Sequence, residues 1–140
     1  EKIDWVSGYQ LKNKEWKGYS NEDQSEYSLR FASGAMVTLT MSNLAMSGRP
    51  RWRLLGEQGS IEDIGGKFLV KTLVNGRQMS TEVEFAKSNW HAYYENIYKH
   101  LLGRAKLIIT PESAARVIGV LEAANVSAAR QSAPVKPAFA

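Results

Sequence analysis

With 140 residues, of which 44% are hydrophobic and 23% charged, the chain has the composition of one folded domain and not that of a disordered chain. It has no cysteine, which excludes disulfides and cysteine-ligated zinc and favours a cytoplasmic location. The formal net charge of +4 comes from basic residues interleaved with acidic ones, which favours a mixed solvated surface over a nucleic-acid-binding face.

Targeting segments and metal sites are also not expected. No apolar run approaches the length needed to span a bilayer, so we expect no membrane segment. Two histidines are too few for a multi-histidine metal site, so we expect no bound metal. The first residues do not resemble a signal peptide, and Glu1 is not preceded by an initiator Met. The chain is therefore expected to begin inside a larger protein or to have been trimmed.

Strand patterns come first along the chain. Residues 3–11 alternate weakly and are rich in aromatics, which predicts a strand, and the polar segment 12–21 predicts a loop. Residues 25–31 and 35–41 alternate apolar and polar side chains on either side of a short turn. This pattern predicts a hairpin with one buried face and one threonine-rich face.

Residues 51–64 predict a strand, a glycine-bounded turn and a second strand. Gly56 and Gly59 flank two polar residues, and glycine reaches positive φ without a steric clash, so the chain is expected to reverse here. Glycine-rich turns can also hold phosphate at a helix start. The segment that follows is too short for a helix, and Glu57 would repel an anion, so a plain hairpin is favoured.

A further hairpin is predicted over residues 68–85. Its turn is Asn75-Gly76, the strongest two-residue hairpin signal in the chain. Short turns join most of the predicted strands, so the sheet is expected to be mainly antiparallel.

The hydrophobic period changes from strand to helix at Ser88 and Asn89, either of which can cap a helix. A second helix is predicted to begin with Thr110 as N-cap and Pro111 at its first position. Two apolar stripes are expected to face the core. The first comprises Trp90, Tyr94, Ile97, Tyr98, Leu101 and Leu102, and the second comprises Ala114, Val117, Ile118, Leu121, Ala124 and Ala128.

This order of strands first and helices last predicts an α+β fold, with a large, mainly antiparallel open-faced sheet and C-terminal helices packed on one face. Residues 1–133 are expected to form a single domain, with residues 134–140 as a tail. The uncovered face of the sheet includes Met36, Val70 and Val83, which suit pairing with a second copy. A homodimer or tetramer built through this open face is therefore expected.

Four motifs, in this order and spacing, resemble a known family. They are Glu22-Asp23 with the run Tyr27 to Gly34, Leu54 to Ile61, Tyr93 to Gly103, and Thr110 to Arg130. Together they are similar to the C-terminal domain of the glucose–fructose oxidoreductase, inositol dehydrogenase and MocA family. The resemblance implies a C-terminal domain like that of glyceraldehyde-3-phosphate dehydrogenase, from an NAD(P)-dependent oxidoreductase acting on sugars, cyclitols and related polyols. In this family a Rossmann domain binds the nucleotide, and the second domain shapes the substrate pocket and builds oligomers.

Several parts of the family's pattern are missing from this sequence. The Rossmann glycine-rich loop, the Glu-Lys-Pro segment with its catalytic Lys, and the helix carrying an Asp and a His would all precede Glu1. The resemblance therefore assigns no catalytic and no cofactor-binding residue to this chain. It implies that NAD or NADP is bound by another part of the parent enzyme, and that this segment alone does not catalyse a reaction.

Candidate substrate contacts lie mainly in the connection before the Gly56–Gly59 hairpin. The resemblance implies that this connection reaches the cleft, which makes Asn43, Arg49 and Arg51 candidates, and the guanidinium fork suits an anionic sugar. Trp16 is a candidate because sugars are held against aromatic faces, and His91 because it lies off the apolar stripe. An exposed loop with ordinary surface arginines stays an open alternative.

Three functions are weighed on this basis. The first is the substrate-binding and oligomerisation domain of an NAD(P)-dependent oxidoreductase that acts on a sugar, cyclitol or related polyol. The second is a stand-alone protein-interaction module of the same fold without catalysis. The third, prompted by the net charge and the four tryptophans, is a nucleic-acid binder.

Overall fold

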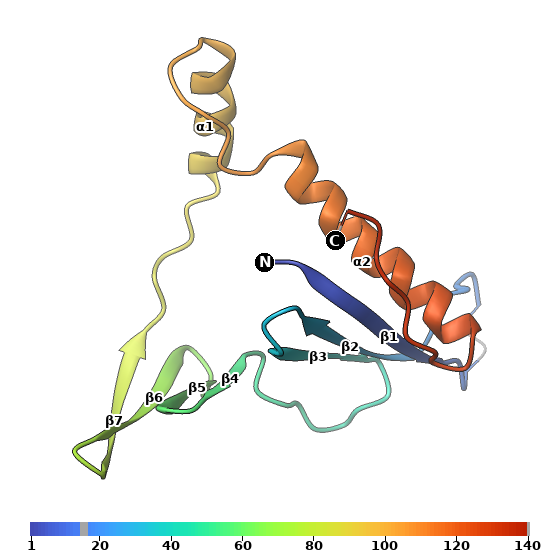
Figure 1. The fold of residues 1–140 in the computed structure, drawn as a ribbon, viewed down its shortest axis with the longest axis horizontal. Helices are drawn as coiled ribbons and strands as arrows, with labels where there is room; N and C mark the ends of the chain where they lie inside the picture. Colours follow the sequence, from blue (N-terminus) through green and yellow to red (C-terminus); the bar gives the residue numbers. More distant parts are fainter. Residues whose placement is uncertain (15–16, 140) are drawn as a thin grey trace. The chain divides into compact units, whose positions relative to one another are not determined.

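The computed structural model describes residues 1–14 and 17–139. The chain divides into two compact units, residues 1–45 with 100–140 and residues 46–99 (Figure 1). Each unit is built on its own antiparallel sheet, and two helices follow the strands in the sequence. The predicted α+β class, with antiparallel strands first and helices last, is confirmed.

The sheet of the first unit has three strands in the order β1-β2-β3. Their bounds are β1 (Ile3–Leu11), β2 (Gln24–Phe31) and β3 (Met36–Ser42). Leu29 lies opposite Val37, and Ser28 lies opposite Thr38. Because side chains alternate along a strand, these pairs lie on opposite faces. The predicted hairpin is confirmed, but its apolar face is buried at Tyr27 and Leu29 of β2, while Leu39 and Met41 of β3 are 40% and 52% exposed.

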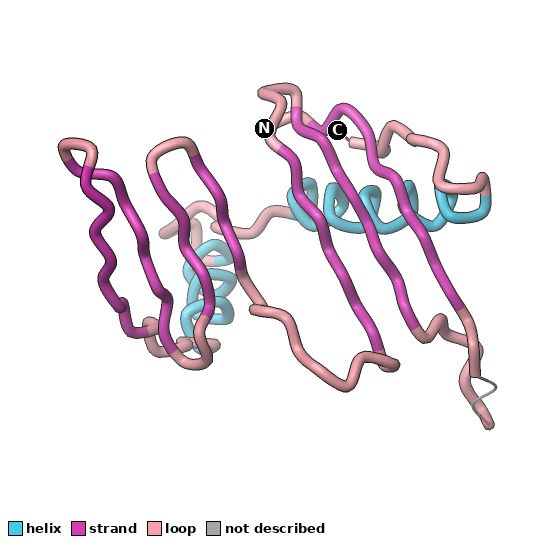
Figure 2. Tube along the Cα trace, turned by 90° about the horizontal axis from the view of Figure 1, so that it is seen from below, coloured by secondary structure: helices cyan, strands magenta, loops and turns pink. Residues whose placement is uncertain are grey.

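Helix α2 (Pro111–Ala129) begins where its capping residues predict. The Thr110 hydroxyl accepts a hydrogen bond from the Ser113 backbone N–H at 3.2 Å, and the Ser113 hydroxyl accepts one from the Thr110 N–H at 3.0 Å. This reciprocal capping box satisfies two backbone donors that a helix start would otherwise leave unpaired. Figure 2 shows the helix on one side of the three-stranded sheet, with the other side open.

The predicted inward face of α2 is wrong for its large residues, although Ala124, which belongs to the predicted stripe, is buried. Val117 and Ile118 are 61% and 62% exposed. The residues that are buried are small: Gly119, Ala123, Ala124 and Ser127. The physical reason is a close approach of backbones, since a Cβ placed on Gly8 of β1 would lie 2.2 Å from the Ala124 carbonyl oxygen. Large side chains do not fit between a strand and a helix at this separation.

The core of the first unit combines side chains of the three-stranded sheet with side chains of α2. Ile3, Val6, Tyr27 and Leu29 come from the sheet, and Ala123 and Ala124 come from α2. Phe31, Val37, Val120 and Val135 pack around this cluster. Val135 lies beyond α2, which shows that the end of the chain also contributes to the packing.

The chain after α2 forms a strap, residues 131–136, along the outer edge of β1. It reverses at Gln131 and Ser132, whose φ values are 58° and 64°. Val135 and Val6 then exchange two backbone hydrogen bonds of 2.8 Å. The strap is held a second time by Ser127, whose hydroxyl accepts from the Gly8 N–H at 3.0 Å and donates to the Ala133 carbonyl at 2.6 Å.

The sheet of the second unit has four strands in the order β4-β5-β6-β7. Their bounds are β4 (Arg53–Gly56), β5 (Gly59–Asp63), β6 (Lys67–Val74) and β7 (Arg77–Glu84). Both predicted hairpins are present. Asn75 and Gly76 have φ values of 51° and 74°, as a two-residue turn that matches the twist of its strands requires.

The role predicted for the glycines of the first hairpin is wrong. Gly56 and Gly59 are not among the glycines with positive φ. Instead, a Cβ on Gly59 would lie 2.1 Å from the Lys71 carbonyl oxygen of β6. Gly59 is therefore required by the close approach of the neighbouring strand and not by the turn.

The two faces of this sheet differ in character. One face carries Trp52, Leu54, Ile61, Phe68, Val70 and Val83, and we call it the apolar face. On the other face the Lys67 ammonium lies 3.1 Å from a Glu82 carboxylate oxygen and 3.2 Å from one of Glu84. The hydrogen bonds that the Lys67 ammonium donates to these two carboxylates, that to Glu82 first, raise the pKa of Lys67.

Helix α1 (His91–Leu101) follows β7 and starts as predicted, because the Asn89 side chain accepts a hydrogen bond from the Ala92 N–H at 3.2 Å. No residue of α1 is buried. Trp90, at its start, is 80% exposed, and Tyr94 and Tyr98 are exposed as well. The amphipathic pattern predicted the helix correctly, but a pattern does not specify the surface that covers the apolar stripe.

Replacing Gly8 with alanine is expected to destabilise the chain by about 1–3 kcal/mol, because the added methyl group forces β1 and α2 apart. Gly48→Ala is the matched control, since a Cβ there meets nothing within 4 Å. Urea denaturation of both variants measures the difference. Equal stability of the two variants would contradict the proposed close contact.

Ser132→Gly is expected to stabilise the chain by about 1 kcal/mol, because glycine adopts positive φ without the Cβ strain that serine carries. The hydrogen bonds that Ser132 makes in the strap use its backbone, so they are retained. Ala128→Gly, inside α2, is the control and is expected to lower the melting temperature. A lower melting temperature for Ser132→Gly would show that the strap does not hold this conformation in solution.

Candidate functional site

The predicted site residues fall in separate parts of the structure. Asn43 lies directly after β3 in the first unit, and Arg49 and Arg51 precede β4 in the second unit. His91 is the first residue of α1, and Trp16 lies outside the described residues. Within residues 1–14 and 17–139, no hydrogen bond or ion pair joins any of these four described side chains to another.

A buried carboxylate organises the end of the first sheet near Asn43. The Asp23 N–H donates to the Leu11 carbonyl at 2.9 Å, and the Asp23 carbonyl accepts from the Asn43 N–H at 2.8 Å. Its side-chain Oδ2 accepts from the backbone N–H groups of Asn13 at 2.7 Å and Lys14 at 2.6 Å. With only 2% of its surface exposed, Asp23 connects the ends of β1, β2 and β3.

A second clamp holds the described residues, 12–14 and 17–23, of the loop that joins β1 to β2. The Lys12 ammonium donates to the backbone carbonyls of Tyr19 at 3.3 Å and Asn21 at 2.9 Å. Tyr19 itself is 72% exposed. Figure 2 shows this loop and the chain that leaves β3 at the same end of the three-stranded sheet. Sequence reasoning missed Asp23, although an Asp between a polar loop and a strand commonly accepts backbone hydrogen bonds.

Arg49 and Arg51 lie in the segment that leads into β4, an edge strand of the second sheet. The Trp52 carbonyl accepts a hydrogen bond from the Asp63 N–H at 2.8 Å, which continues the β4–β5 pairing by one residue. Both arginines are exposed. In the part of the chain that the structure describes, neither guanidinium group forms an ion pair, so both are available to an anion in solution.

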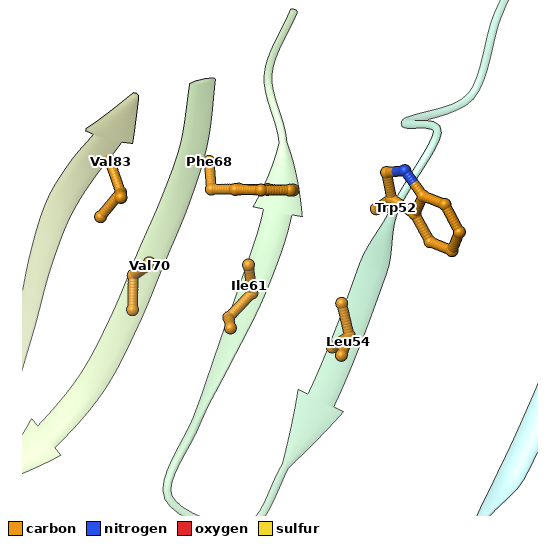
Figure 3. Close-up of a pocket in the computed structure, with 6 residues that line it drawn as sticks. All are labelled: Trp52, Leu54, Ile61, Phe68, Val70 and Val83. Atoms are coloured by element: carbon orange, nitrogen blue, oxygen red, sulfur yellow. The ribbon is translucent and has the colours of Figure 1, made fainter. Parts of the chain in front are cut away.

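The apolar face of the second sheet contains a shallow hollow of about 310 Å³. Figure 3 shows its six lining side chains, which come from all four strands and from Trp52 just before β4. The Phe68 and Phe85 rings pack beside each other with centroids 4.6 Å apart. The lining offers only one polar group, the Trp52 indole N–H, so the hollow suits an apolar surface better than a polyhydroxylated ligand.

The described residues do not fit a nicotinamide dinucleotide. Such cofactors bind where a strand leads through a glycine-rich turn into a helix, whose N-terminus faces the pyrophosphate. In the described ranges every strand pairing is antiparallel, and the Gly56–Gly59 turn joins two strands and carries Glu57. Nor does any group of three or more His, Asp or Glu residues within these ranges have the arrangement to hold a metal ion.

Neither α1 nor α2 is both long and apolar enough to cross a bilayer.

Solved structures share the fold of this chain. The YPO2259 protein of Yersinia pestis has a TM-score of 0.83 at 19% sequence identity, with 97% of this chain and 44% of that one covered. An oxidoreductase from Bacillus cereus has a TM-score of 0.78 at 18% identity, with 96% and 46% covered. The WlbA dehydrogenase of Bordetella pertussis, in complex with NADH and UDP-GlcNAcA, has a TM-score of 0.66 at 20% identity, with 96% and 39% covered. The chain thus spans less than half the length of these proteins.

Comparison of the sequence with curated proteins gave no match. Residues 3–136 match the family described as "Oxidoreductase family, C-terminal alpha/beta domain". This match covers nearly the whole chain and agrees with the antiparallel strands and C-terminal helices of the structure. The chain therefore belongs to the glucose–fructose oxidoreductase, inositol dehydrogenase and MocA family, as its C-terminal domain.

Proposed function

We propose that the chain is the substrate-binding and oligomerisation domain of an NAD(P)-dependent oxidoreductase that acts on a sugar, cyclitol or related polyol. The observation that carries this proposal is the family match over residues 3–136. The WlbA dehydrogenase, which shares the fold, has been solved with NADH and UDP-GlcNAcA. The nicotinamide cofactor is proposed to be bound by another part of the parent enzyme, because residues 1–14 and 17–139 do not offer the strand-turn-helix arrangement that such a cofactor needs.

The substrate contacts are proposed to come from Asn43, Arg49 and Arg51. Asn43 offers an amide that both donates and accepts hydrogen bonds, which suits the hydroxyl groups of a polyol. The exposed guanidinium groups suit a carboxylate or phosphate on the substrate, because two parallel N–H donors match its two oxygens. Trp16 and His91 are proposed as further contacts on the sequence argument alone.

Oligomerisation is proposed to use the apolar face of the second sheet. Val83 is 46% exposed and Leu54 is 55% exposed, and both belong to a continuous apolar surface. Surfaces of this kind, rimmed by polar residues, mark sites of protein association. A second copy can present the same face, because two-fold pairing is self-complementary.

Substitution of Arg49 and Arg51 by glutamine together is expected to weaken binding of a hexuronate about tenfold, through loss of charge-assisted hydrogen bonds, with little effect on a neutral hexose. Arg77→Gln, at the first residue of β7, removes one such charge elsewhere in the second unit and is the control. Calorimetric titration of the chain measures both affinities. An equal loss in the Arg77 variant would show that only the net charge matters.

Val83→Lys is expected to convert the self-associated chain to monomer, because it places a charge on the apolar face. Ser80→Lys adds the same charge to the opposite face of the same strand and should leave the assembly intact. Sedimentation velocity over a range of protein concentrations measures the change. A wild-type chain that is monomeric at every concentration would refute self-association through this face.

The alternative function is a stand-alone protein-interaction module of the same fold. The hollow on the apolar face favours it, because its lining suits an apolar partner surface and not a polyol. If sugars and sugar acids leave the chain unchanged while self-association through this face persists, the interaction module is favoured over the substrate domain.

A further inference from the structure

We propose that the outer edge of β1 is also a binding site for the strap of a second copy of this chain, so that two chains exchange their straps at high concentration. In the structure the strap lies on β1 of its own chain, which is the major form. The exchanged dimer makes the same contacts between two chains. This interaction is independent of the proposed substrate contacts, and it uses a different surface from the apolar face.

The edge of β1 holds the strap through groups that a second copy also presents. Val6 and Val135 exchange two backbone hydrogen bonds of 2.8 Å, and Val135 packs against the core of the first unit. The Ser127 hydroxyl donates to the Ala133 carbonyl at 2.6 Å. The strap is joined to these elements only through the chain that follows α2. A strap from a second copy therefore fits the same acceptors once the first strap has left.

The residues after the strap extend this fit onto α2. Pro137 is buried, and a Cβ on Gly119 would lie 2.6 Å from the Ala138 carbonyl oxygen. Figure 1 shows this last segment of the chain, in dark red, running back beside α2. The missing side chain at Gly119 leaves the space that the backbone of this segment occupies. The site therefore matches the end of this chain better than it matches an arbitrary extended peptide.

The reversal between α2 and the strap holds strain that exchange releases. Gln131 and Ser132, with φ values of 58° and 64°, are consecutive residues in the left-handed region, and neither is glycine. A Cβ makes this conformation unfavourable at each position. Both residues return to extended backbone when the strap leaves its own chain. Short hinges under strain favour domain exchange, because the exchanged form keeps the contacts and loses the strain.

Two prolines keep the released strap extended. Pro134 and Pro137 fix their own φ at about −65°, and they disfavour helical backbone at Ala133 and Lys136, which precede them. A segment that is already extended loses less conformational freedom when it binds. The released strap is therefore prepared for binding to a second copy.

A disulfide between β1 and the strap identifies which chain supplies the strap, because the chain has no cysteine of its own. Val6→Cys with Val135→Cys places two thiols across an antiparallel pair, whose Cα separation of about 5.5 Å suits a disulfide. After incubation at high protein concentration, oxidised glutathione converts the closed form to a cyclised monomer and the exchanged form to a covalent dimer. Electrophoresis without reductant measures their ratio. Val83→Lys is included throughout to prevent association through the apolar face, and Val135→Cys without Val6→Cys measures random disulfides.

Two hinge variants are expected to change the ratio of dimer to monomer in opposite directions. Gln131→Pro should raise it at least tenfold, because proline cannot adopt a φ of 58° and keeps the hinge open. Ser132→Gly should lower it about 25-fold, because glycine removes strain worth roughly fivefold in each of two chains. Asn75→Gly is the matched control, since Asn75 also has a positive φ, 51°, but lies in the β6–β7 turn. It should leave the ratio unchanged.

Three results would overturn the inference. Equal ratios in Ser132→Gly and Asn75→Gly would show that strain at the hinge does not drive exchange. A folded Gln131→Pro variant that gives no covalent dimer would show that an open hinge does not lead to exchange. Covalent dimer that never exceeds the random level in any variant would show that β1 does not accept the strap of a second copy. If circular dichroism shows that Gln131→Pro does not fold, the comparison of Ser132→Gly with Asn75→Gly decides.

Discussion

The contact between Gly8 of β1 and Ala124 of α2 determines how the first unit is built. A strand and a helix meet there backbone to backbone, so the helix buries its small residues and leaves Val117 and Ile118 in solvent. The same closeness brings the Ser127 hydroxyl within hydrogen-bonding distance of the Gly8 N–H. Ser127 in turn holds the strap, so the packing of α2, the core and the end of the chain all depend on this one separation.

Features with local causes were predictable from the sequence. The Asn75-Gly76 turn, the Thr110 cap and the strands on either side of each turn depend on residues adjacent in the chain, and all are confirmed. Of the buried face of α2 only Ala124 was predicted, because alanine and glycine carry little hydrophobic signal and the larger residues define a different stripe. Which stripe of α2 is buried depends on Gly8, more than a hundred residues earlier in the chain. The hydrophobic periodicity of α2 carries no information about how closely α2 approaches β1.

For the candidate site as well, the sequence predicted individual residues but not how they are arranged in space. Asn43, Arg49 and Arg51 were chosen from the sequence by their place in one connection, and the structure divides them between the two units. Asp23 was missed as an organising residue because its role depends on backbone groups of Leu11, Asn13, Lys14 and Asn43, which carry no side-chain signal. A sequence motif shows which chemical groups a side chain carries, but it does not show which backbone amides donate hydrogen bonds to that side chain.

The pairing of Val135 with Val6 covers part of an exposed strand edge. An exposed strand edge is a template on which another chain can add a strand, and proteins commonly cover such edges. By pairing with Val6, the strap blocks strand addition along the middle of β1. The last residues thus protect the folded chain against edge-to-edge aggregation, and shortening the chain before Val135 would expose the Val6 N–H and carbonyl as a nucleus for intermolecular sheet growth.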